Sequence, residues 1–155
     1  MRCANCGGTI HVNEPCCDCG IDYKTMMNGI SHNELKRLFK IIKEKENQDF
    51  TYEMSLAACE LENSSMILPV MIDGDSRGIV ELPGIRNMKF IAIATDMEEF
   101  DKCFEDFTPM TNSWDMFMDL LYDGVEGFVV NPLGETCFLG RNFLIPFFEG
   151  ENDNL

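Results

Sequence analysis

Two copies of one short pattern dominate the start of the chain. Residues 3–7 read CANCG and residues 16–20 read CCDCG, so each carries C-x-x-C-G, with nine residues between Cys6 and Cys16. Each pair can form a tight turn that points two thiolates at one metal ion, and the glycine accepts the positive φ that closes the turn. Four sulfurs from two facing turns fit the tetrahedral coordination of Zn²⁺. We therefore predict a zinc site formed by Cys3, Cys6, Cys16 and Cys19.

Other interpretations of these cysteines fit less well. Disulfides require an oxidising compartment, which nothing else in the sequence indicates. Iron sites of the rubredoxin type use the same turns, but their two pairs usually lie much further apart. A thioredoxin-like pair needs a single C-x-x-C at a helix start. If Cys17 paired with Cys19, the C-x-C spacing would be too short for the turn, so we favour Cys16 as the ligand. Whether Cys17 or His11 takes part in metal binding stays open. Four cysteine ligands leave no position for substrate, so we expect the zinc to be structural.

The metal is expected to make this segment fold. Residues 1–24 contain too few apolar side chains to form a core alone, whereas structural zinc supplies on the order of 10 kcal/mol in comparable peptides. Residues 3–20 resemble the short zinc ribbons at the ends of many bacterial proteins. That resemblance implies a module that contacts proteins or, less often, nucleic acids.

Charge is distributed unevenly along the chain. The formal net charge is −15, and because residues 1–50 carry seven basic and seven acidic side chains, the whole excess lies in 51–155. Such a surface repels phosphate backbones and anionic lipid, which argues against nucleic acid as a partner of the main domain and against a membrane. A basic protein partner fits, although acidity also serves solubility alone. No signal peptide and no apolar run of ~20 residues is visible, so we expect a cytoplasmic protein whose single cysteines, Cys59, Cys103 and Cys137, are reduced and in the core.

Hydrophobic periodicity predicts an α+β domain over residues 31–149. Ser31 and Glu34 form a capping-box pattern ahead of an amphipathic helix, and a second helix is expected at 51–63. Strands follow at 66–72 and 78–82 around a turn, then a buried strand at 90–94 that leads into a helix at 97–105 with Asp96 as N-cap. The remaining elements are a helix at 113–122, strands at 126–131 and 135–139, and a helix at 141–149. We expect a mixed, mostly antiparallel sheet with flanking helices, and a disordered tail over 150–155.

The order of these segments is similar to a known family. Leu68-Pro69, the stretch from Phe90 to Phe100, and "GFVVNPLGE" from Gly127 to Glu135 resemble the N-terminal domain of the SseB family (enhanced serine sensitivity protein B). Asn131, Pro132 and Gly134 are the sharpest matches. "IAIATD" departs from the family pattern, which has an aromatic residue before the threonine, and no stretch of these 155 residues resembles the C-terminal SseB domain. The matching motifs are structural turns, so the resemblance implies a fold and little chemistry.

Nothing in the sequence assembles a catalytic set. The chain has two histidines, no phosphate-binding loop, no G-x-S-x-G motif and no dinucleotide fingerprint, so we predict that it is not an enzyme. We expect a protein-interaction or regulatory module whose partner has an unknown identity. The candidate binding residues are Asp115, Asp119, Asp123, Glu126 and Asn131. One alternative is an immunity-type inhibitor that covers a basic toxin with its acidic face; the other is an uncharacterised enzyme.

Overall fold

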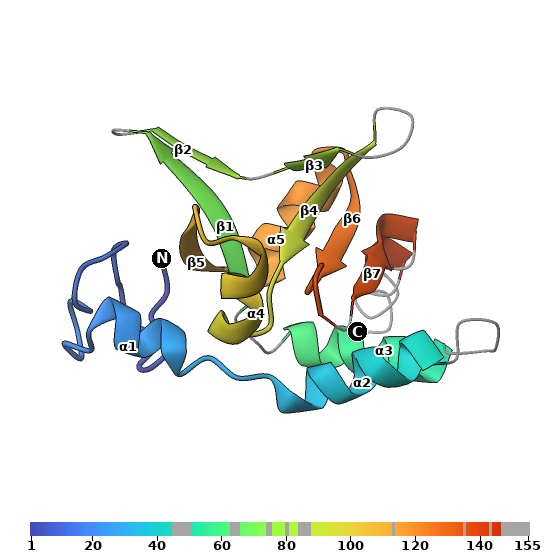
Figure 1. Cartoon of the computed structure of the whole chain (residues 1–155), viewed down its shortest axis with the longest axis horizontal. Coiled ribbons are helices and arrows are strands. Elements are labelled where there is room, and N and C mark those ends of the chain that lie inside the picture. The colour runs from blue at the N-terminus through green and yellow to red at the C-terminus, as the bar shows by residue number, and fades with distance from the viewer. Residues whose placement is uncertain are drawn as a thin grey trace.

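The computed structural model describes residues 1–44, 51–62, 66–73, 76–79, 81–83, 88–112, 114–134, 136–142 and 144–146. It is an α+β structure, as predicted (Figure 1). The expected tail at 150–155 and the end of the expected helix at 141–149 lie outside the described residues. Within that helix, residues 141–142 and 144–146 are helical.

Three helices precede the strands. They are α1 (Tyr23–Asn28), α2 (Asn33–Glu44) and α3 (Thr51–Glu62). Helix α1 was not predicted, although its signals are in the sequence: the Asp22 side chain accepts from Thr25 N at its start, and Gly29 closes its end. The predicted capping box at α2 is wrong. The helix begins at Asn33, with His32 O accepting its first hydrogen bond, and the Glu34 carboxylate pairs with Arg37 instead.

In the part of the chain that the structure describes, seven strands form two small sheets that are joined by one isolated bridge. The first sheet has the order β2 (Ser76–Ile79), β1 (Met66–Asp73), β5 (Thr108–Asn112), and all its pairs are antiparallel. The second has the order β3 (Glu81–Pro83), β4 (Lys89–Ile93), β6 (Val125–Val130), β7 (Cys137–Gly140), with β4 and β6 parallel. Two hydrogen bonds join Ile67 to Ala94 and so link the sheets. The single strand predicted at 78–82 is wrong, because β2 and β3 belong to different sheets.

Two further helices, α4 (Met97–Cys103) and α5 (Trp114–Tyr122), follow β4 and β5. Side chains alternate across a strand, so β4 contributes to two cores. Ile91 and Ile93 face the larger core, which contains Phe117 and Leu121 of α5 together with residues of α2 and α3. Ala92 and Ala94 face a second core, which contains Phe100 of α4 and residues of the N-terminal segment. No helix among the described residues has both the length and the apolar character that crossing a bilayer requires.

Candidate metal centre

Two turns with the same hydrogen-bond pattern carry the four N-terminal cysteines. In the first turn Gly7 N donates to Cys3 O at 2.9 Å and Cys3 N to Gly8 O at 2.8 Å. In the second turn Gly20 N donates to Cys16 O and Cys16 N to Ile21 O, both at 3.0 Å. Gly7 has a φ of 79° and Gly20 one of 74°, values that strain any residue with a Cβ. The sequence prediction of two glycine-closed turns is therefore confirmed.

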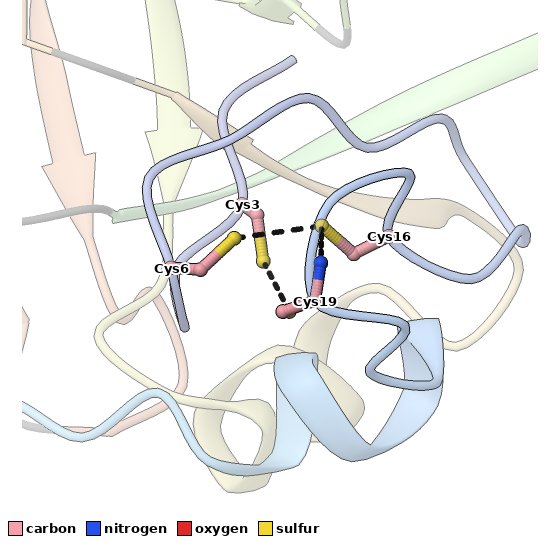
Figure 2. A group of neighbouring side chains, drawn as sticks. All are labelled: Cys3, Cys6, Cys16 and Cys19. Atoms are coloured by element: carbon pink, nitrogen blue, oxygen red, sulfur yellow. Dashed lines mark hydrogen bonds between the residues drawn. The ribbon is translucent and has the colours of Figure 1, made fainter.

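The four sulfur atoms of Cys3, Cys6, Cys16 and Cys19 lie within 4.8 Å of one another (Figure 2). Two contacts cross between the turns: Cys6 Sγ to Cys16 Sγ is 3.6 Å and Cys3 Sγ to Cys19 Sγ is 3.9 Å. Four sulfurs at the usual 2.3 Å from one metal ion would be about 3.8 Å apart in a regular tetrahedron. The spacing thus fits a metal ion with four cysteine ligands. Cys17 is exposed and stands outside this group.

Backbone and side-chain N–H groups point at the sulfurs. Gly8 N donates to Cys6 Sγ at 3.3 Å, and Asp18 N donates to Cys16 Sγ at 3.4 Å. The Asn5 amide donates to Cys19 Sγ at 3.5 Å. This bond, followed by one from the backbone of Ile21, lowers the pKa of the Cys19 thiol to about 6. Because a metal ion binds the thiolate form, donors of this kind favour metal binding at neutral pH.

Asp18 holds the two turns together. Its Oδ2 accepts from Thr9 N at 2.8 Å. A Cβ on Gly8 would lie 2.0 Å from the same oxygen, so only glycine permits this approach. Between the turns, Thr9 forms an antiparallel bridge with Arg2.

The N-terminal residues 1–30, here called the cysteine segment, are packed against the rest of the structure. The Tyr23 hydroxyl donates to Pro109 O, and Thr111 Oγ1 donates to Arg2 O at 3.2 Å, so β5 receives both contacts. Cys3, Ile10 and Met27 are buried in the same core as Ile67, Ala94 and Phe100. Side chains of the N-terminal segment therefore share one core with side chains of β1 and α4. A hollow of about 550 Å³ beside it is lined in part by Asn5, Met26 and Glu34.

The other predicted site residues lie elsewhere. Asp119 and Asp123 are exposed, one helical turn apart at the end of α5, and Glu126 in β6 is half-buried. The side chain of Asp115 lies outside the described residues. Asn131 is only 1% exposed. Its Oδ1 accepts from Thr95 N and its Nδ2 donates to Thr95 Oγ1, both at 3.0 Å, so this amide ties β6 to β4. The Asn131 side chain is therefore buried between the ends of β4 and β6 rather than exposed at the surface.

A polar cluster that the sequence did not reveal lies beside Asn131. Lys36 of α2 contacts Asp96 Oδ2 at 2.9 Å, and Lys102 contacts Glu99 Oε1 at 3.1 Å. Glu99 is buried, and its Oε2 has no hydrogen-bond partner among the described residues. A Cβ on Gly134 would lie 2.3 Å from that oxygen. The Asn131–Gly134 turn is thus fitted closely to the carboxylate of Glu99.

The three single cysteines differ in burial. Cys137 is buried, and burial raises the pKa of its thiol to about 11. Cys103 is half-buried and packs against the second core, whereas Cys59 is exposed, so the prediction that Cys59 lies in the core is wrong. Compared with known protein families, with curated proteins and with solved structures, the chain matches none.

Proposed function

We propose that the four cysteines hold one structural Zn²⁺ ion and that the chain is a non-catalytic protein-interaction or regulatory module with an SseB-like main domain. The observation that carries the metal assignment is the group of four sulfurs at tetrahedral spacing, with N–H donors on them. All four ligands come from cysteine, so the ion would have no open position for a substrate or a water molecule. The metal would act by holding the two turns in the position that packs on β5.

Two further observations support a role outside catalysis. Cys137, the one deeply buried single cysteine among the described residues, has a raised pKa and so stays a protonated thiol rather than a nucleophile at neutral pH. The two exposed carboxylates at the end of α5 stand where the helix dipole disfavours negative charge. Acidic side chains kept at an unfavourable position suit contact with a basic partner.

Metal content of the purified full chain tests the first part of the proposal. We expect one zinc per chain by plasma mass spectrometry and its loss in the Cys3→Ser/Cys19→Ser variant. Cys17→Ser and Cys59→Ser are the matched controls and should keep the ion. Iron with visible charge-transfer absorbance would overturn the zinc assignment, and zinc retained by the double variant would overturn the ligand set.

A native pull-down with the same variants tests the second part. A stoichiometric partner that binds the parent chain and is lost with the metal would place recognition on the cysteine segment. A partner kept by the double variant would place it on the main domain. A chain that stays a partner-free monomer and shows turnover in a broad hydrolase and sulfurtransferase screen would overturn the interaction function.

A further inference from the structure

Two of the four proposed metal ligands are open to solvent and two are not. Cys6 and Cys19 are exposed, whereas Cys3 is 1% exposed and Cys16 is 4% exposed. A metal ion keeps its cysteine ligands in the thiolate form, and the thiolates that solvent can reach are the ones that peroxides oxidise first. Oxidation of this group would therefore begin at Cys6 and Cys19.

Each exposed sulfur lies close to a buried sulfur of the opposite turn. Cys6 Sγ is 3.6 Å from Cys16 Sγ, and Cys19 Sγ is 3.9 Å from Cys3 Sγ (Figure 2). Because the S–S bond of a disulfide is about 2.05 Å long, each sulfur would have to move by about 0.8–0.9 Å to form one. A rotation of the side chains can supply a movement of this size while the backbone of both turns stays in place.

Contacts that do not involve sulfur hold the two turns face to face. Thr9 directly follows the first turn, and its N–H donates to Asp18 Oδ2 in the second turn at 2.8 Å. The carbonyl of Thr9 accepts from Cys17 N at 3.0 Å. These bonds do not need the metal ion, so the cysteines of the two turns would still face one another after the ion has left.

The four sulfurs could be paired within the turns or across them. Pairing within the turns would join residues three positions apart, Cys3 to Cys6 and Cys16 to Cys19. Pairing across the turns joins residues that are 10 and 16 positions apart. A disulfide that closes a longer loop removes more conformational freedom from the unfolded chain and so stabilises the folded state more. This difference, together with the contacts between the turns, favours the pairs Cys6–Cys16 and Cys3–Cys19.

We propose that the cysteine group is also a site of oxidative modification, at which hydrogen peroxide replaces the metal ion by two disulfides, Cys6–Cys16 and Cys3–Cys19. The proposal rests on the metal assignment above. In each pair the exposed thiolate attacks the O–O bond, becomes a sulfenic acid and releases hydroxide. The buried thiolate then attacks that sulfur and displaces a second hydroxide. Each pair thus gives two electrons to one peroxide molecule, and four protons from solvent convert the four hydroxides to water as Zn²⁺ leaves.

The oxidised chain is expected to keep the cysteine segment packed on β5. The bonds that join the segment to β5 come from the Tyr23 hydroxyl and the Arg2 carbonyl, and neither involves a cysteine. Removal of the ion by a chelator has a different result, because it leaves four thiol groups with no link between the turns. Oxidation would therefore exchange the metal for covalent cross-links without unpacking the segment, and a thiol reductant would restore the metal site.

The test treats the full zinc-bound chain with hydrogen peroxide and follows free zinc with a metal-sensitive dye. We expect one zinc to be released for two peroxide molecules consumed, with the loss of four thiols, and dithiothreitol with added zinc should reverse both changes. Proteolysis on the N-terminal side of Asp18 separates Cys16 from Cys19. Fragmentation of the product in a mass spectrometer should then show Cys19 linked to Cys3, and Cys6 linked to Cys16.

Two measurements check the order of events. When peroxide is limiting, a reagent that traps sulfenic acids should label Cys6 and Cys19 ahead of their buried partners. Cys17→Ser and Cys59→Ser each remove an exposed cysteine outside the group. They are the matched controls and should release zinc as the parent chain does.

Amide exchange distinguishes the oxidised chain from a chain stripped by a chelator. Ile67 and Ala94, which share a core with the cysteine segment, should exchange at least about tenfold more slowly in the oxidised chain. Equal exchange in the two forms, disulfides within the turns or to Cys17, sulfinic acids in place of disulfides, or zinc retained in excess peroxide would overturn the proposal while the zinc assignment stands. A purified parent chain without zinc would overturn the zinc assignment and this proposal together.

Discussion

Replacing Asn131 should destabilise the fold, because its side chain bonds inside the protein. In Asn131→Ala the buried Thr95 N–H loses its acceptor, at a cost of about 2 kcal/mol. Thr95 Oγ1 loses a donor but keeps its bond to Asp96. Asn131 has a φ of 50°, a conformation that adds about 1 kcal/mol for alanine. We therefore expect a loss of about 3 kcal/mol, which in a chain of this size lowers Tm by about 6–12 °C.

Asn131→Gly separates the two effects. Glycine tolerates the positive φ, so this variant should lose only the hydrogen-bond contribution, about 2 kcal/mol. The assay is urea unfolding followed by circular dichroism at fixed zinc concentration, with Tm as a second measure. If both variants unfold within about 0.5 kcal/mol of the parent, the reasoning from the Thr95 contacts is refuted. If a stable variant loses its partner, Asn131 would be a binding residue after all.

Three further predictions concern the other contacts. Gly134→Ala should force the Glu99 carboxylate away from Lys102 and cost about 2 kcal/mol in urea unfolding; a midpoint equal to that of the parent would contradict this. Burial raises the pKa of Asp96, but hydrogen bonds from Lys36 and from the Glu99 backbone outweigh it and hold the pKa below 3.8. The stabilisation is therefore present above pH 3.8 and is lost as pH falls through the lowered value. Lys36→Met should raise this pKa in a carboxyl ¹³C NMR titration, and an unmoved value would show that the Lys36 contact has no part in it. Removing the metal with a chelator should speed amide exchange at Ile67 and Ala94, which lie under the cysteine segment, and spare the Phe128–Leu139 pair; equal exchange at both places would argue against a metal-dependent core.

The sequence was most informative where covalent chemistry or local backbone geometry decides the outcome. The cysteine pairs and their glycines predicted the metal group, since a C-x-x-C-G turn depends on adjacent residues alone. The α2 and α3 helices and the buried β4 strand also followed from periodicity. These patterns depend only on residues that are close together in the sequence, so the sequence alone is enough to predict the elements.

Elements defined by distant partners were missed. Strand β5, with the sequence TPMTN, shows no apolar alternation and contains a proline. It is a strand because β1 lies beside it, with Pro109 opposite Pro69, where neither residue needs to donate an N–H. The contact between Gly134 and Glu99 and the burial of Asn131 likewise depend on residues about 35 positions apart, and a single sequence does not show such pairings.

The position of the cysteine segment in the chain has a consequence for the order of folding. It leaves the ribosome before β5 does, and its turns need only residues 1–21 to close on an ion. Its packing partners come much later: Tyr23 and Pro109 are 86 residues apart, and Arg2 and Thr111 are 109 apart. At a synthesis rate of about 5–20 residues per second, the segment spends several seconds with Ile10 and Met27 uncovered. If zinc binds during this time, the cysteine segment would already be ordered when β5 is synthesised and packs against it.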